Sequence, residues 1–174
     1  MEVLNHGLKG KDSLSVAGGT FVLTCGKDGL RSENTEDASL GSVYIQNGEF
    51  QIDAQGDAVS ASGALQVDGG TFSTDTADDS IHAGGADSSG FGMRQQDQFA
   101  SSASNGGTLD LTCNGSGNTA LDTDGSYANN GGTVTTNDGS EENPGAMGGG
   151  QGGMGGKMGG GRQNSTTPPS STAP

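Results

Sequence analysis

Short runs in which apolar and polar residues alternate recur along the chain, and a pair of small turn residues interrupts each run. The clearest copy has Leu65 and Val67 alternating with polar residues, then Gly69-Gly70, and then Phe72. Alternation with a period of two is typical of a β-strand with one buried face, and a glycine pair between two such runs indicates a bend. The pattern therefore predicts short strands joined by tight bends.

The other copies align with this one on the glycine pair. The second residue of the pair is at position 19, 48, 70, 107 and 132, so successive steps are 29, 22, 37 and 25 residues. A polar loop at residues 33–39 and an insertion within about residues 84–105 account for the longest steps. A repeat of this length indicates a solenoid or a propeller, and a propeller blade needs about 40 residues. We therefore predict an all-β protein, a right-handed parallel β-helix (solenoid) of about five turns.

Stacked coils place equivalent residues in ladders about 4.8 Å apart. The internal ladders that we expect are Phe21–Phe50–Phe72 and Leu14–Val43–Leu65. Cys25 and Cys113 share a column, since each lies five residues after the threonine of a Gly-Gly-Thr, but they are three coils apart. That separation is about 14 Å, whereas a disulfide requires Cα atoms within about 7 Å. The register thus predicts two free thiols.

Composition limits the core and divides the chain. Only 28% of the residues are hydrophobic and 35 of the 174 are glycine, so the core must be thin and regular. We expect residues 1–143 to form the β-helix domain. We also expect it to be N-terminally truncated, because His6-Gly7-Leu8 already fills a position of the repeat and the first coil would leave an open strand edge. Residues 144–174, first Gly/Met-rich and then Ser/Thr/Pro-rich, are expected to be a disordered tail.

The net charge of −14 restricts the partners. Nucleic acid and anionic membrane surfaces require a basic face, so both are excluded as expected partners. No stretch is long and apolar enough to span a membrane, and the first twenty residues lack the apolar core of a signal peptide. We expect a monomer that binds cations or neutral surfaces.

An acidic residue recurs at one position of the repeat, as Asp28, Asp57 and Asp79. Carboxylates stacked one coil apart repel each other, and a cation between them would remove that cost. Ca²⁺ takes six to eight oxygen ligands, which stacked aspartates and backbone carbonyls supply, and Asp78 adds a further carboxylate. These residues predict a calcium site. The alternative is that they are solvated turn residues, because aspartate is common in turns.

A second acidic motif, Asp122-Thr123-Asp124-Gly125, resembles the start of an EF-hand loop. The twelfth position of such a loop requires a bidentate glutamate, but this chain has Thr133 there. An EF-hand is therefore excluded, and we expect Asp122 and Asp124 to contribute to a calcium site in a turn.

Five further side chains are candidates for contact with a ligand. Lys27 and Arg31 flank Asp28, either as the base of a lyase or as exposed charges that balance an acidic face. His82 lies beside Asp79, and the two histidines lack the Cys or Glu cluster that would favour zinc. Phe91 and Phe99 lie in the long insertion, where they would form a lid over one face or anchor the insertion to the rod.

Three segments together resemble a known family: LSVAGGTFVLTCGKDGLRS, LQVDGGTFSTDTADDSIHA and GNTALDTDGSYANNGGTV, the last of which precedes the Gly/Met-rich tail. The chain is similar to bacterial extracellular carbohydrate-binding-domain proteins, which are calcium-containing right-handed parallel β-helices like those of polysaccharide lyases. The resemblance implies non-catalytic binding of plant cell-wall polysaccharide, such as cellulose or pectin, with Ca²⁺ in the turns. It also implies an extracellular or cell-surface location. The rival hypotheses are a pectate-lyase-like enzyme and an adhesin stalk without glycan specificity.

Overall fold

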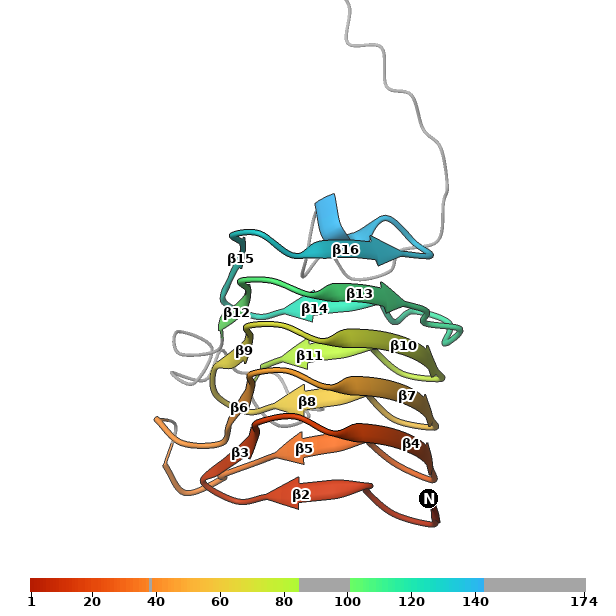
Figure 1. Ribbon diagram of the computed structural model, residues 1–174. Helices are drawn as coiled ribbons and strands as arrows, with labels where there is room; N and C mark the ends of the chain where they lie inside the picture. The colour runs from red at the N-terminus through yellow and green to blue at the C-terminus, as the bar shows by residue number, and fades with distance from the viewer. Residues whose placement is uncertain (38, 85–100, 143–174) are drawn as a thin grey trace, which may run out of the picture.

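The computed structural model describes residues 1–37, 39–84 and 101–142, and it shows a stack of β coils (Figure 1). The chain visits three sheets in turn, and every strand pairs in parallel with the equivalent strand of the next coil. The six-stranded sheet contains β1 (Glu2–Val3), β4 (Thr20–Cys25), β7 (Glu49–Ala54), β10 (Thr71–Thr76), β13 (Thr108–Leu111) and β16 (Thr133–Thr136).

Two five-stranded sheets complete each coil. The β2 sheet contains β2 (Leu8–Gly10), β5 (Leu30–Ser32), β8 (Val59–Ala61), β11 (Ile81–Ala83) and β14 (Leu121–Thr123). The β3 sheet contains β3 (Ser13–Val16), β6 (Ser42–Ile45), β9 (Leu65–Val67), β12 (Ser101–Ser104) and β15 (Ser126–Asn129). The prediction of an all-β parallel β-helix of about five turns is confirmed.

The alternating residues bury one side of each strand, as the sequence pattern predicts. In β7 every second residue is buried, and Phe50 stacks on Phe21 and Phe72 with ring centroids 5.0 and 4.3 Å apart. The second predicted ladder also forms, because Val43 pairs in register with Leu14 on one side and Leu65 on the other. The thin core is therefore a set of ladders parallel to the coil axis.

The bend between the β3 sheet and the six-stranded sheet requires glycine at the second position of the pair, whereas the first position is Asn47 in one coil. The second residue has a positive φ in successive coils, 139° at Gly48 and 104° at Gly70. A Cβ at Gly48 would also lie 2.8 Å from the ring of Phe50. Glycine is thus the residue that accepts both the left-handed backbone and the close approach of the stacked ring.

Both predicted insertions lie between the β2 sheet and the β3 sheet. One separates β5 from β6, and the other separates β11 from β12. Residues 85–100 of the second insertion lie outside the described residues, and so do Phe91 and Phe99. The predicted tail at residues 144–174 lies outside them as well.

The two cysteines lie in one column, as the repeat predicts. Cys25 pairs with Ala54, Ala54 with Thr76, and Thr76 with Cys113, which places the thiols three coils apart. Both are free and buried. The prediction of two free thiols is confirmed, and burial raises the pKa of each above its ordinary value.

We expect both thiols to be unreactive in the native protein and to react fully once the chain is unfolded without reductant. The reason is that the thiolate is the reactive form, and burial disfavours it. The measurement is a count of modified cysteines by mass spectrometry before and after unfolding. An intramolecular disulfide in that experiment would contradict the three-coil separation.

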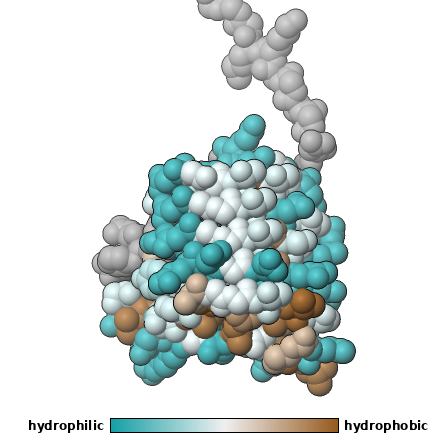
Figure 2. Space-filling view, in the orientation of Figure 1, coloured by the Kyte–Doolittle hydropathy of each residue, from teal (hydrophilic) through white to brown (hydrophobic). Residues whose placement is uncertain are grey.

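The two ends of the stack differ. At the C-terminal end, residues after β16 cover β14: Asp138 accepts a hydrogen bond from the backbone N–H of Ala120, and Ser140, in the 3-10 helix Ser140–Glu142, accepts one from that of Leu121. At the N-terminal end Leu4 is 97% exposed and Val22 54%. Apolar surface accordingly gathers near that end in Figure 2. Within the part of the chain that is described, no helix has the length and apolar character needed to cross a membrane.

Candidate functional site

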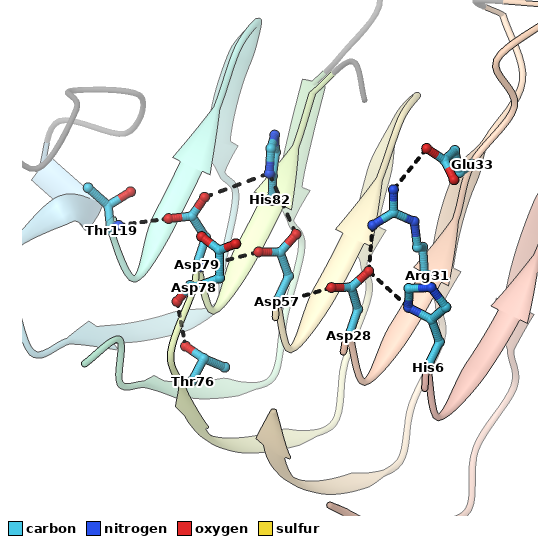
Figure 3. A network of polar contacts seen from close by, with 10 residues as sticks. All are labelled: His6, Asp28, Arg31, Glu33, Asp57, Thr76, Asp78, Asp79, His82 and Thr119. Carbon is cyan, nitrogen blue, oxygen red and sulfur yellow. Dashed lines mark hydrogen bonds and ion pairs between the residues drawn. The ribbon is translucent and has the colours of Figure 1, made fainter. Parts of the chain in front are cut away.

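An aspartate column, formed by Asp28, Asp57 and Asp79, follows the corner where each coil enters the β2 sheet. Each residue lies two positions before a strand of that sheet, and all three are buried. Oδ1 of Asp28 accepts a hydrogen bond from the backbone N–H of Asp57 over 3.1 Å, and Oδ1 of Asp57 accepts one from that of Asp79 over 3.2 Å (Figure 3). Oδ1 of Asp79 in turn accepts one from Thr119 over 2.7 Å. One oxygen of each carboxylate therefore ties its coil to the next.

The local sequence explains why the column forms. The aliphatic residue two positions after each aspartate enters the core, so the acid is held at the corner; these aliphatic residues are Leu30, Val59 and Ile81. The residue between the aspartate and the aliphatic residue must be small; in one coil it is Gly29, where a Cβ would lie 2.6 Å from Cγ2 of Ile52. A Cβ at Gly56 would collide with Oδ1 of Asp28. The repeated acid-small-aliphatic motif thus fixes the carboxylates in register.

A second outward column runs beside the aspartates on the β2 sheet. Its members in coil order are Lys9, Arg31, Ser60, His82 and Asp122. Nδ1 of His82 lies 3.6 Å from Oδ2 of Asp57 and 3.7 Å from Oδ2 of Asp79 (Figure 3). One possible ligand atom from each of these three residues lies within 4.8 Å of the others. The imidazole therefore contacts the carboxylate oxygens that do not take part in the coil-to-coil hydrogen bonds.

The buried carboxylates and the imidazole shift each other's titration. Burial alone would lower the pKa of His82, but the hydrogen-bonded carboxylate of Asp57, together with Asp79 and Asp122, raises it to about 9. Burial raises the pKa of Asp79 to about 7; the N–H of Thr119 opposes this rise, and the nearby charge of Asp57 adds to it. In the metal-free protein at neutral pH, a cationic His82 thus compensates the acids of the C-terminal half of the column.

Asp28 has two partners of its own: the cationic Arg31, and His6, whose pKa is lowered by burial. Nη1 of Arg31 lies 2.6 Å from Oδ2 of Asp28, and Nη2 of Arg31 donates to Oε1 of Glu33 over 2.8 Å. His6 fills the column position one coil earlier, with Nδ1 3.1 Å from Oδ2 of Asp28. Burial opposes the charge of Arg31, but its bonds to Glu33 and Asp28 raise the pKa of the guanidinium above its already high value. Arg31 is therefore a fixed counter-charge for Asp28.

A groove of about 530 Å³ runs past both columns, from His6 in the first coil to Gly84 in the fourth. We call it the column groove. It brings together seven of the residues that the sequence predicts for a site: Lys27, Asp28, Arg31, Asp57, Asp78, Asp79 and His82. The described residues that line it include no phenylalanine, tyrosine or tryptophan. The described part of this groove therefore offers a ligand mainly hydrogen bonds and charge.

The remaining predicted residues lie elsewhere. Asp122 is in β14, in register with His82, and Asp124 follows that strand, so both belong to the next coil and neither lines the groove. The sequence motif that starts at Asp122 therefore lies on a solenoid strand. Two contacts were not predicted from the sequence: that of His6 with Asp28 and that of Glu33 with Arg31. The repeat alignment had nevertheless placed His6 in the aspartate position of the first coil.

A parallel β-helix with a polar groove along its coils is a fold on which extended polymers can bind. The chain belongs to the family described as carbohydrate-binding domain-containing protein, whose model matches residues 1–143. No curated protein and no solved structure matches the chain.

In EDTA, the free energy of unfolding is expected to fall as the pH rises from about 5 to about 9. The pKa of Asp79 in the folded state is about 7 instead of 3.8, and that of His82 is about 9 instead of 6.5. In both cases the folded state holds the proton more tightly than the unfolded state does. The stability that each protonated group contributes is therefore present at low pH and is lost as the pH rises through its folded-state pKa. The expected loss is on the order of 3 kcal/mol.

The measurement is urea unfolding at a series of pH values for the wild type and for Asp79→Asn. The variant should lose less stability between pH 5 and pH 7, because its amide does not titrate. A free energy of unfolding that rises steadily across this range would contradict the assignment.

Proposed function

We propose that this chain binds plant cell-wall polysaccharide, cellulose or a pectin-like polymer, along the column groove, as a secreted or cell-surface module with calcium in its turns. The observation that carries the proposal is the open polar groove, which crosses four coils of a chain that belongs to a carbohydrate-binding family. A solenoid groove offers a ligand the same register of side chains in each coil, which suits a linear polymer of repeated sugar units. The proposed mechanism is non-catalytic.

The proposed calcium site lies between the carboxylates of Asp57 and Asp79, which belong to successive coils. The two Oδ2 atoms there are outside the coil-to-coil hydrogen bonds, and Asp78 lines the same part of the groove. Carboxylate oxygens fit Ca²⁺, but imidazole nitrogen does not. His82 lies where a cation would contact both oxygens, so calcium binding requires its side chain to turn away. Asp28, held by Arg31, is the least suited of the three aspartates.

The test is a glycan array probed with and without EDTA. Binding of cell-wall polysaccharides by the wild type, weakened by EDTA, is the expected result. Retained calcium binding without any glycan binding would favour a stalk instead.

The enzyme alternative has a separate readout. A lyase needs a base beside the bound uronate. Arg31 already makes two ion pairs, with Asp28 and Glu33. Among the described residues that line the groove, Lys9 and Lys27 are the other lysine or arginine side chains that could act as that base. Release of an unsaturated uronide from pectin would favour that alternative.

A further inference from the structure

The lysine and arginine residues of the described chain gather at one end of the column groove. They are Lys9, Lys11, Lys27 and Arg31, all within the first two coils of a protein whose net charge is −14. Three of them line the groove, whereas Asp57, Asp78 and Asp79 line its other half. The groove is therefore bipolar along the coil axis, with Arg31 and His6 toward one end and Asp78 and Asp79 toward the other (Figure 3).

These cations differ in how far their charge is compensated. Arg31 is held by Asp28 and Glu33. The ammonium group of Lys9 is 3.7 Å from Glu33, and half of its side chain is exposed. Lys27 is exposed and makes no ion pair with any residue of the described part of the chain. The uncompensated charge of the basic end is thus that of Lys27, and Lys9 is the other lysine that lines this end of the groove.

We propose that Lys27 and Lys9 form an anion subsite, which binds the carboxylate of an acidic sugar directly and without a metal ion. This inference rests on the proposed glycan binding and specifies its ligand as an acidic polysaccharide. Neutral cellulose offers no charge for an ammonium group to pair with, and the described residues that line the groove include no phenylalanine, tyrosine or tryptophan on which its sugar rings could stack. A polymer with a carboxylate on each sugar is repelled by the aspartate half, unless a cation bridges the two, and it is attracted by the lysine half.

The two halves then bind the same polymer by different chemistry. The lysine half makes charge-assisted hydrogen bonds that persist in EDTA, whereas the aspartate half requires a bound cation. Lysine suits the subsite because its ammonium is a point charge on a flexible stem and can follow a sugar carboxylate. The bipolar groove also gives the bound chain a preferred direction, because only one end of the groove accepts an anion unaided.

The experiment measures binding of a short galacturonate oligomer and of its methyl-esterified counterpart by calorimetry, with calcium and with EDTA. The variant is Lys27→Glu, and the matched control is Lys11→Glu. The control changes the net charge by the same amount as Lys27→Glu does. Lys11 lies in the first coil, but it pairs with Glu36 and does not line the groove. Thermal unfolding of both variants checks that they fold.

We expect the wild type to retain measurable binding of the galacturonate oligomer in EDTA. Lys27→Glu should weaken that binding by roughly tenfold, which is about 1.4 kcal/mol, and Lys11→Glu should change it by less than about threefold. Binding in EDTA should also weaken as salt is added, because exposed charges are screened. The methyl ester should not bind in EDTA.

Each of the following results would overturn the inference. Equal effects of the two variants would mean that only net charge matters, and unchanged binding in Lys27→Glu or equal binding of the methyl ester would remove the anion subsite while leaving the proposed glycan binding intact. Tighter binding of a sulfated oligosaccharide of the same length would overturn the carboxylate as its ligand. A wild type that binds no glycan in any condition would overturn the proposed function as well.

Discussion

Replacement of Phe50 by alanine is expected to lower the free energy of unfolding by about 3–5 kcal/mol, as for other large buried aromatic side chains. Phe50 is 3% exposed and lies in the middle of its ladder, stacked on Phe21 at 5.0 Å and on Phe72 at 4.3 Å. Truncation removes both ring contacts and leaves a cavity that the fixed coil spacing prevents from closing. The measurement is urea unfolding followed by far-UV circular dichroism.

Tyr44 is the matched control for this prediction. It belongs to the same coil and is also aromatic, but it points outward and is 39% exposed. Tyr44→Ala should therefore cost less than about 1 kcal/mol, as is usual for surface substitutions. Similar losses for the two variants would contradict an internal phenylalanine ladder.

Calcium is expected to raise the stability of the wild type by about 2.7 kcal/mol at a hundredfold excess over its dissociation constant. The reason is that the ion binds the stacked carboxylates of the folded state alone, because unfolding separates the coils. Asp57→Asn should weaken calcium binding more than Asp28→Asn does. Asp57 has a neighbour of the column on each side, whereas Oδ2 of Asp28 is held by Arg31 at 2.6 Å. The measurement is melting temperature against calcium concentration for the three proteins.

Asparagine is a suitable replacement because its side-chain oxygen still accepts the coil-to-coil hydrogen bond while the charge is removed. Mg²⁺ serves as the ion control and should substitute poorly, since it demands a tight octahedron. A wild-type melting temperature that EDTA leaves unchanged would show that the column carries no calcium, and the calcium part of the proposed function would then fall.

Local repetition made the fold predictable. In a parallel solenoid each coil repeats one set of requirements, so the glycine bend and the inward Phe50 and Phe72 mark equivalent positions without any knowledge of the tertiary structure. The same alignment placed Cys25 and Cys113 three coils apart and put the three aspartates in one column. Insertions did not disturb the register, because the strands that flank them, β5 and β6 and then β11 and β12, still pair with the equivalent strands of the neighbouring coils.

The candidate site was predictable only in part. The repeat identified Asp28, Asp57 and Asp79 as equivalent, but equivalence alone suggests three carboxylates with the same surroundings. In the structure they differ: Arg31 neutralises the first, and His82 contacts the other two. These contacts depend on which side chains of the two neighbouring columns meet, and equivalence in the repeat does not specify that.

The sequence by itself determined what repeats: the strands, the bends, the internal ladders and the column of acids, because each arises from a local pattern that recurs in every coil. Only the tertiary structure decided what does not repeat. The second column carries Lys9, Arg31, Ser60, His82 and Asp122 in successive coils, so its charge changes from basic to acidic along the axis. Stacking brings Arg31 beside Asp28, and His82 beside Asp57 and Asp79. The physical reason is that a hydrophobic pattern fixes which side of a strand is buried, whereas the balance of charge in the groove also depends on distances between residues of successive coils, such as Lys9 and Glu33 or Asp57 and His82.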